Sequence, residues 1–338
     1  MSRLRFGACL FALGCALVPA HAEVASDALS VTARIAGADG KWDFSEIDPQ
    51  TGRLLVARSN GVMAVDLATR KVTDTLVPGA GVHGVLPLPG TPFAISTNGK
   101  SANAVLFDIA TGKVEATLPT GQSPDALVFE PKSGLVVVFN GKSHDASLID
   151  AKARAVVGSI ALDGKPEVGA VDGEGHVFVN LEDKATIAVL DIAARKTVAT
   201  YALPGCEAPT GLAYDAATGV LIAACDNEVA KVIDAKSGRD LATLKIGKGP
   251  DGVLLDAARR RAFVPTADGN LTMISLKSAS EITVAGSVTT APGARSGALD
   301  PATGALYLPT AKMAAPKAQG ERPEQIPGSF EILVVTAK

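Results

Sequence analysis

The sequence is poor in aromatic residues and has no excess of positive charge. One Trp, three Tyr and ten Phe make up only 4% of the 338 residues, and 32 Lys and Arg face 35 Asp and Glu, a formal net charge of −3. This balance argues against a general nucleic-acid binder, whose contact surface is normally basic. No long apolar run occurs after residue 25, so we expect no transmembrane segment in the body of the protein. Because 47% of the residues are hydrophobic, a folded core is expected and a disordered or coiled-coil chain is excluded.

The first 22 residues have the pattern of a secretory signal peptide. Arg3 and Arg5 form a positive region, residues 6–18 are apolar, and residues 20–22 read Ala-His-Ala, a typical cleavage site. We therefore expect a periplasmic or secreted protein of residues 23–338, and loss of the two arginines lowers its net charge from −3 to −5. The alternative is a lipoprotein signal acylated at Cys15, although Leu is missing from the position that such a signal usually requires.

Cysteine is also scarce, and only Cys206 and Cys225 remain after the predicted cleavage. In an oxidising compartment such a pair, 19 positions apart, is typical of a disulfide. A hairpin that turns at residues 216–217 would place Cys225 opposite a residue near Pro209, within reach of Cys206. A metal-binding or catalytic thiol pair is the weaker alternative, because there is no C-x-x-C spacing and no nearby His.

Internal repeats organise the rest of the chain. An apolar segment that ends in Asp or Ser recurs every 41 to 43 residues, at positions 66, 108, 150, 191, 234 and 275. A second apolar segment with a central turn precedes each of these, as in the D-P-x-T-G turns at residues 48–52 and 300–304. Asp and Gly favour such turns, because Asp bonds the backbone of its own turn and Gly accepts a positive φ. Each repeat thus contains four short strands.

These repeats predict an all-β fold, a seven-bladed β-propeller with four antiparallel strands per blade, which forms a single domain over residues 23–338. The last repeat ends without a fourth strand. Residues 29–37, LSVTARIAG, resemble the fourth strands of other repeats, so we expect the N-terminal strand to complete the last blade and close the ring.

The repeats resemble the YncE-like, or YVTN-repeat, seven-bladed propellers. The resemblance lies in the strand endings FVN (178–180), VFN (138–140), FVP (263–265) and YLP (307–309), and in the turns FDIATGKV and IDAKSGRD. It implies an exported propeller used for binding, with no reaction common to the family. The segment FDIATGKVEATL also resembles the repeat of quinoprotein dehydrogenases, but each repeat lacks its Trp and the chain is short for eight blades, so no quinone cofactor is inferred.

Aligned first strands predict a ring of polar residues at one mouth of the central channel. One residue per blade, five positions before the turn that follows its first strand, contributes to this ring. The ring residues are Asp43, His83, Asp125, Glu167, Thr210, Asp251 and Arg295. Their formal charges sum to −3, with His neutral.

Two interpretations of this ring stay open. Asp43, His83, Asp125, Glu167 and Asp251 could bind a divalent metal ion or a cationic ligand, with Arg295 binding a carboxylate or neutralising a neighbour. Converging carboxylates repel one another, which raises some of their pKa values unless a cation offsets the repulsion. The alternative is a hydrated polar mouth without a defined ligand. No nucleophile and base have a recognisable spacing, so no catalytic residue is assigned.

Loops on the same face supply a candidate rim. Residues 312–328 form a long insertion in the last blade that could act as a lid or partner-binding arm, and long loops are uncommon without a role. The rim candidates are Asn140, His144, Lys312 and Arg322. Trp42, the only Trp, is interpreted as a packing anchor between blades rather than a stacking platform.

The sequence therefore predicts a monomeric binding scaffold that presents this mouth to a protein, peptide or small-molecule ligand of the cell envelope. The alternative is a metal-dependent hydrolase or lyase, lactonase-like in plan, that uses the acidic ring. Nucleic acid is an unlikely partner for an acidic mouth, although the basic run at residues 259–261 leaves it open.

Overall fold

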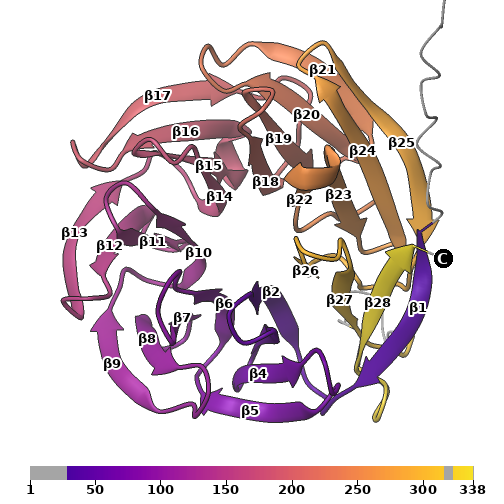
Figure 1. The fold of residues 1–338 in the computed structure, drawn as a ribbon. Helices are drawn as coiled ribbons and strands as arrows, with labels where there is room; N and C mark the ends of the chain where they lie inside the picture. The colour runs from indigo at the N-terminus through magenta and orange to yellow at the C-terminus, as the bar shows by residue number, and fades with distance from the viewer. Residues whose placement is uncertain (1–28, 316–322, 338) are drawn as a thin grey trace, which may run out of the picture.

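The protein is a ring of seven antiparallel sheets around a central channel (Figure 1). The computed structural model describes residues 29–315 and 323–337, so the predicted signal peptide and Arg322 lie outside the described residues. The described part of the chain holds only two short helices, η1 (Glu182–Lys184) and η2 (Ala257–Arg259), and none of its helices could cross a membrane. Each sheet has four strands, which confirms the predicted seven-bladed propeller.

The first four blades each use four consecutive strands, numbered from the channel outward (Figure 1). Blade 1 contains β2 (Trp42–Asp48), β3 (Arg53–Arg58), β4 (Gly61–Asp66) and β5 (Val72–Pro78). Blade 2 contains β6 (Val82–Pro87), β7 (Phe93–Asn98), β8 (Asn103–Asp108) and β9 (Val114–Pro119). Blade 3 contains β10 (Pro124–Glu130), β11 (Leu135–Asn140), β12 (Asp145–Asp150) and β13 (Ala155–Ala161). Blade 4 contains β14 (Pro166–Val171), β15 (His176–Leu181), β16 (Thr186–Asp191) and β17 (Lys196–Ala202).

The last three blades follow the same plan, but the last one borrows its outer strand. Blade 5 contains β18 (Pro209–Asp215), β19 (Val220–Cys225), β20 (Val229–Asp234) and β21 (Asp240–Lys245). Blade 6 contains β22 (Leu254–Asp256), β23 (Arg261–Thr266), β24 (Asn270–Ser278) and β25 (Glu281–Thr289). Blade 7 contains β26 (Ala298–Leu299), β27 (Leu306–Thr310), β28 (Glu331–Ala337) and β1 (Leu29–Ala36).

The N-terminal strand closes the ring as the sequence predicts. β1 pairs antiparallel with β28, with Leu29 opposite Ala337 and Ala36 opposite Glu331. An ion pair between Arg34 and Glu331 adds to the backbone ladder. This pairing covers the edge of the last blade that would otherwise be open, and it joins the first and last strands of the described chain.

The repeated Asp residues stabilise the turns between strands by a local mechanism. In blade 2 the Asp108 carboxylate accepts hydrogen bonds from the Thr111 amide and hydroxyl, both 2.8 Å long. Gly112 follows with φ +73°, a conformation that a side chain would strain. The same Asp and Thr pairing recurs at Asp66 and Thr69, which explains why the turn sequence repeats.

The hydrophobic core lies between neighbouring blades. The middle strand β11 buries Val136, Val137, Val138 and Phe139 completely, so both of its faces pack against other sheets. Phe139 packs against Gly169 of blade 4, where an added Cβ would lie 2.4 Å from the aromatic ring. Close packing of this kind favours small and aliphatic residues and accounts for the low aromatic content.

The basic run at residues 259–261 is engaged in ion pairs. Arg260 makes two hydrogen bonds of 2.7 Å with the carboxylate of Asp215, which is 1% exposed. Arg261 bonds Asp256 at 2.9 Å, and Arg259 pairs with the same carboxylate at 3.3 Å. Arg260 thus connects blades 5 and 6, while Arg259 and Arg261 stabilise the buried Asp256 within blade 6.

Candidate functional site

All seven ring residues line one cavity of about 360 Å³ at the mouth of the channel. The cavity, called the mouth cavity below, is also lined by Glu182 and Asp226, which sequence reasoning missed. Both follow the second strand of their blade, as the rim candidate Lys312 does in blade 7. A search of the loops at this position for carboxylates would have found them.

A β-bulge at the start of the inner strands positions most ring residues. In β2 the register passes from Trp42 opposite Arg58 to Ser45 opposite Val56, so Asp43 and Phe44 of β2 oppose the single residue Ala57 of β3. The same shift occurs in β6, β10, β14 and β18. A bulge of this kind re-aims a side chain, here toward the channel. In blades 6 and 7 the ring residues Asp251 and Arg295 precede their short inner strands instead.

His83 lies between two carboxylates of the ring. Its Nδ1 donates a hydrogen bond to Asp43 Oδ2 at 2.7 Å and lies 3.9 Å from Asp125 Oδ1. The bond to Asp43 and the surrounding negative charges outweigh partial burial and raise the pKa of His83 to about 9. His83 is therefore an imidazolium at neutral pH.

Lys165 neutralises part of the ring, although the sequence analysis did not select it. Its Nζ lies 2.7 Å from Glu167 Oε1 and also contacts Glu182. Burial alone would lower the pKa of Lys165, but the hydrogen bonds to these two carboxylates outweigh it and raise the pKa. Lys165 stands two positions before a ring residue, and only the fold shows that its side chain turns back toward the mouth.

Three ring carboxyl groups are destabilised in their charged form. Burial, reinforced by repulsion from neighbouring carboxylates, raises the pKa of Asp125 and of Glu167 to about 7. Burial also raises the pKa of Asp251 to about 7, even though Arg295 Nε lies 3.1 Å from its carboxylate. The mouth therefore holds more negative charge than its own cations offset, as converging carboxylates predict.

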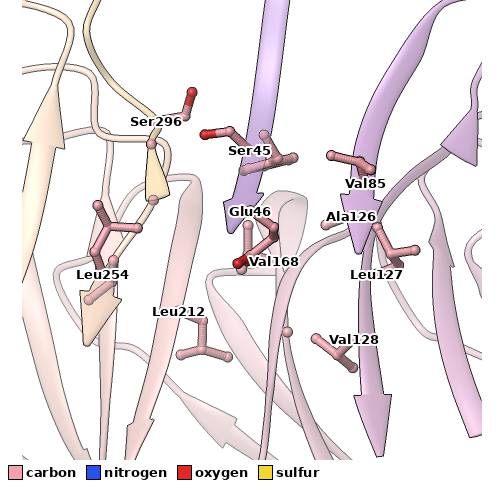
Figure 2. Close-up of a pocket in the computed structure, with 16 residues that line it drawn as sticks. Ser45, Glu46, Val85, Ala126, Leu127, Val128, Val168, Leu212, Leu254 and Ser296 are labelled. Atoms are coloured by element: carbon pink, nitrogen blue, oxygen red, sulfur yellow. The ribbon is translucent and has the colours of Figure 1, made fainter. Parts of the chain in front are cut away.

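The channel holds a second cavity of about 160 Å³, called the bore below (Figure 2). Phe44 lines both cavities, so the two adjoin. Most of the bore is lined by glycine and by apolar side chains such as Val85, Leu127 and Leu212. Among the described residues Glu46 is the only charged residue that lines the bore, and it projects from β2 (Figure 2).

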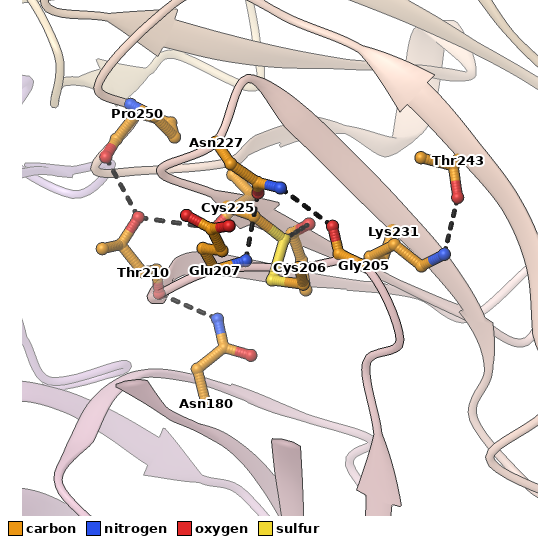
Figure 3. The surroundings of a disulfide bond; sticks show 12 residues. Asn180, Gly205, Cys206, Glu207, Thr210, Cys225, Asn227, Lys231, Thr243 and Pro250 are labelled. Atoms are coloured by element: carbon orange, nitrogen blue, oxygen red, sulfur yellow. Dashed lines mark hydrogen bonds between the residues drawn. A yellow bond between two sulfur atoms is a disulfide. The ribbon is translucent and has the colours of Figure 1, made fainter. Parts of the chain in front are cut away.

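The disulfide predicted from the sequence joins Cys206 to Cys225 next to the mouth (Figure 3). Its location follows from the hairpin register, which places Cys225 opposite Pro209. The bond ties the loop before β18 to the end of β19, and Asn227 adds hydrogen bonds to the Glu207 amide and the Gly205 carbonyl. The backbone that leads into the ring is thereby held in place.

Thr210 has a structural role within the ring. Its hydroxyl donates a hydrogen bond of 3.0 Å to the Pro250 carbonyl of the next blade (Figure 3). Its own carbonyl accepts a hydrogen bond of 2.9 Å from Asn180 of the preceding blade. Thr210 therefore links three blades, and its hydroxyl hydrogen is already used.

The rim predicted from the loops is only partly present. Asn140 does not lie on the rim: it is fully buried, and its amide donates to Asp145 at 2.7 Å and to Ser147 at 2.9 Å, because the end of β11 is covered by the following turn. His144 is exposed in that turn with φ +52°. Lys312 is exposed at the base of the long loop.

The described ends of the long loop are fixed against blade 1. Met313 and Gln325 form an isolated β-bridge, and the Gln325 side chain accepts a hydrogen bond from the Gly40 amide and donates one to Asp39. Trp42 packs against Phe330, with ring centroids 5.6 Å apart, which agrees with its predicted role as a packing anchor. The base of the loop is therefore part of the mouth's rigid framework.

Part of the ring has the donor set of a metal site. One ligand atom each from Asp43, His83 and Asp125 lies within 4.8 Å of the others. Two carboxylate oxygens and an imidazole nitrogen fit Zn²⁺ or a similar divalent ion. Binding through Nδ1 would require loss of the proton that His83 now shares with Asp43. Glu167 and Asp251 do not belong to this cluster.

Comparisons with known proteins show the fold alone. No protein-family model matches the chain, and no curated protein matches it in sequence. A structure titled Kuenenia stuttgartiensis hydrazine synthase is similar with a TM-score of 0.69 and 17% identity, over 80% of this chain and 93% of that one. A chain of a mitotic checkpoint complex structure is similar with a TM-score of 0.72 and 13% identity, over 90% and 95% of the two chains. At such identities the resemblance supports the propeller architecture and no shared activity.

Proposed function

We propose that this protein is an exported binding scaffold whose mouth cavity takes a positively charged group of a small ligand, a peptide or a protein. The observation that carries the proposal is the set of three carboxyl groups, Asp125, Glu167 and Asp251, whose pKa values burial and repulsion raise to about 7. A bound cation would lower these pKa values again. The free energy lost by crowding the carboxylates is then recovered on binding.

The charge balance of the mouth favours a cation over an anion. Six carboxyl groups line the mouth cavity, while the cations beside them are His83, Arg295 and Lys165. A mouth with excess negative charge attracts cations over several ångströms and repels anions. The long-loop base and the disulfide hold the surrounding backbone, so the site is largely formed before a ligand arrives.

Export and family membership belong to the same proposal. The N-terminal pattern of residues 1–22 supports secretion, and the disulfide between Cys206 and Cys225 suits an oxidising compartment. The repeat endings support a place among YncE-like propellers, for which an exported scaffold used for binding is expected, and the scaffold is proposed to be a monomer. Secretion of a tagged full-length chain, with cleavage after Ala22 read by mass spectrometry, tests this part.

Calorimetric titration of the purified protein with ethylammonium chloride at pH 8 tests the mouth, and sodium acetate serves as the anion control. We expect saturable binding of the cation only. Asp251→Asn should weaken it about fivefold to tenfold, since a charge-assisted hydrogen bond is lost. The matched control is Glu174→Gln, a carboxylate with 79% exposure between β14 and β15. No saturable heat with the cation, or equal binding of acetate, would overturn the proposal.

A second candidate is a divalent-metal site that supports hydrolase or lyase chemistry. The cluster of Asp43, His83 and Asp125 favours it. When bound, the ion would supply Lewis-acid activation, while the remaining carboxylates would orient a substrate or hold a proton. Titration with Zn²⁺, Mn²⁺ and Ca²⁺, followed by thermal unfolding with and without EDTA, tests the site. Absence of stoichiometric metal together with an unchanged Tm would exclude it.

A further inference from the structure

The disulfide joins two segments that line the mouth cavity (Figure 3). Cys206 lies two residues before Ala208 and four before Thr210, and both of these residues line the cavity. Cys225 directly precedes Asp226, which lines the same cavity just after the end of β19. Movement of the backbone at either cysteine would therefore change the shape of the mouth and the position of one of its carboxylates.

The segment that leads into blade 5 is longer than its counterparts. Residues 203–208, which connect β17 to β18, number six, whereas the connections into β10 (120–123) and β14 (162–165) have four. A longer loop has more conformations to lose when it is ordered. The bond to Cys206 lies within this segment and restricts those conformations.

Backbone hydrogen bonds hold this segment less well than the equivalent segments of other blades. In blades 2, 3 and 6 the residue just before the first inner-strand pairing has a positive φ, and its carbonyl accepts a hydrogen bond from the end of the second strand. The donor and acceptor pairs are Gly99 and Gly81 at 2.7 Å, Gly141 and Ser123 at 2.9 Å, and Ala267 and Gly249 at 2.9 Å. In blade 5 the equivalent residue is Ala208, with φ +43°, and its carbonyl accepts no hydrogen bond in the described part of the chain. The Asp226 amide bonds the Glu207 carbonyl instead, at 2.8 Å.

Ala208 is therefore strained and weakly held. A positive φ crowds the Cβ of any residue but glycine, and the following Pro209 favours an extended conformation for the residue before it. The nearest side-chain hydrogen bonds come from Asn227 and end at the Gly205 carbonyl and the Glu207 amide, at 2.9 and 3.0 Å. Neither holds Ala208 itself, so the disulfide two residues away is the strongest restraint on its conformation.

We propose that the disulfide between Cys206 and Cys225 is a redox switch for cation binding at the mouth. A dithiol reductant supplies two electrons and two protons: its thiolate attacks the Cys206 sulfur, the S–S bond breaks, both cysteines become thiols, and the dithiol closes to its own disulfide. Cys206 is the accessible partner, since it is 6% exposed and Cys225 is fully buried. Ala208 then relaxes toward an extended conformation, and the backbone at Thr210 and Asp226 loses its fixed position.

The inference rests on the proposed cation binding at the mouth and adds the regulation of that site. Two events that affect the same backbone must be linked in both directions. If reduction weakens the binding of a cation, then the bound cation opposes reduction by the same factor. A disulfide that only stabilises the fold would show neither effect on a protein that stays folded.

Calorimetric titration with ethylammonium chloride at pH 8, before and after reduction by dithiothreitol, tests the switch. Thiol counting confirms the reduction, and circular dichroism follows the fold. We expect the Kd to rise about fivefold on reduction, at the lower end of typical coupling between sites. Saturating ethylammonium should lower the equilibrium constant for reduction by dithiothreitol by about the same factor, while sodium acetate should leave it unchanged.

Variants separate the switch from a loss of stability. The double variant Cys206→Ala and Cys225→Ala should bind ethylammonium as the reduced protein does, with or without dithiothreitol. Ala208→Gly adopts the positive φ without strain, so its Kd should rise less than about twofold on reduction. The matched control is Ala102→Gly, since Ala102 also has a positive φ, +49°, in the turn after β7. This control should keep the full change.

Equal affinities of the oxidised and reduced proteins would overturn the redox switch and leave cation binding at the mouth intact. The same conclusion would follow from a redox effect that persists in full in Ala208→Gly, or from unfolding of the reduced protein, since a switch requires a folded reduced state. Failure of the oxidised protein to bind ethylammonium would overturn both proposals.

Discussion

Asp125→Asn should stabilise the protein at alkaline pH. It does so although the substitution removes a carboxylate that lies near two cations of the mouth, His83 and Lys165. The pKa of Asp125 rises from its usual 3.8 to about 7, first because the group is buried and then because Asp43 repels it. When folding raises the pKa of a group, that group stabilises the folded state fully at pH values below its pKa in the unfolded chain. This stabilisation is lost as the pH rises through the pKa of the group in the folded protein. Above about pH 7 the ionised Asp125 carboxylate therefore lowers the free energy of unfolding.

The magnitude follows from the size of this shift. One pKa unit corresponds to 1.36 kcal/mol, so a rise from 3.8 to about 7 gives a ceiling of about 4 kcal/mol. The side chain is 26% exposed, and the variant also loses the attraction of His83, which lies 3.9 Å away. We therefore expect Asp125→Asn to be about 2 kcal/mol more stable than the native protein at pH 8 and to differ little at pH 4.

Urea unfolding at pH 4, 6 and 8 measures this difference, with the slope of each transition as a check that the same surface is exposed. Glu174→Gln, which is exposed and far from the ring, should leave the curves unchanged at all three pH values. A stabilisation that is absent at pH 8, or that is as large at pH 4 as at pH 8, would show that crowding of carboxylates in the mouth is not the cause. Added ethylammonium chloride at pH 8 should stabilise the native protein more than the variant.

Three further changes test the framework around the site. Replacement of Cys206 and Cys225 by Ala should lower the free energy of unfolding by about 3 kcal/mol, as expected for a loop of 19 residues, and a reducing agent should have the same effect on the native protein only. Arg260→Ala should cost about 3 kcal/mol in urea unfolding because Asp215 then stays buried without its bidentate partner, and Arg260→Lys should recover only part of this loss. His83→Gln should remove the fall in stability that we expect as the pH rises from about 6.5 through about 9, read from Tm against pH.

The positions of the ring residues could be predicted because every blade repeats the same strand and turn lengths. Counting back from the Asp turns locates an equivalent residue in each blade, and the bulges at the start of five inner strands aim these residues at the channel alike. The charged residue of the bore, Glu46, could also have been found from the sequence. The corresponding residues in the next two blades are Leu86 and Val128, so Glu46 is a carboxylate at a position where the repeat is apolar.

Local repetition in the sequence determined the blade count, the closure by residues 29–36 and the disulfide, because each depends on pairing between strands that are close in sequence or on an unpaired last repeat. Only the tertiary structure decided how the charges at the mouth combine. Lys165 turns back to Glu167 and Asn140 is buried, which depends on side-chain orientation rather than on the repeat pattern. The carboxylates of five blades crowd into one space, and these contacts join residues of different repeats. The near-neutral net charge of the whole chain does not reveal the excess of negative charge at the mouth cavity. Electrostatic energy depends on the distances between particular groups and on their burial, which net charge does not contain.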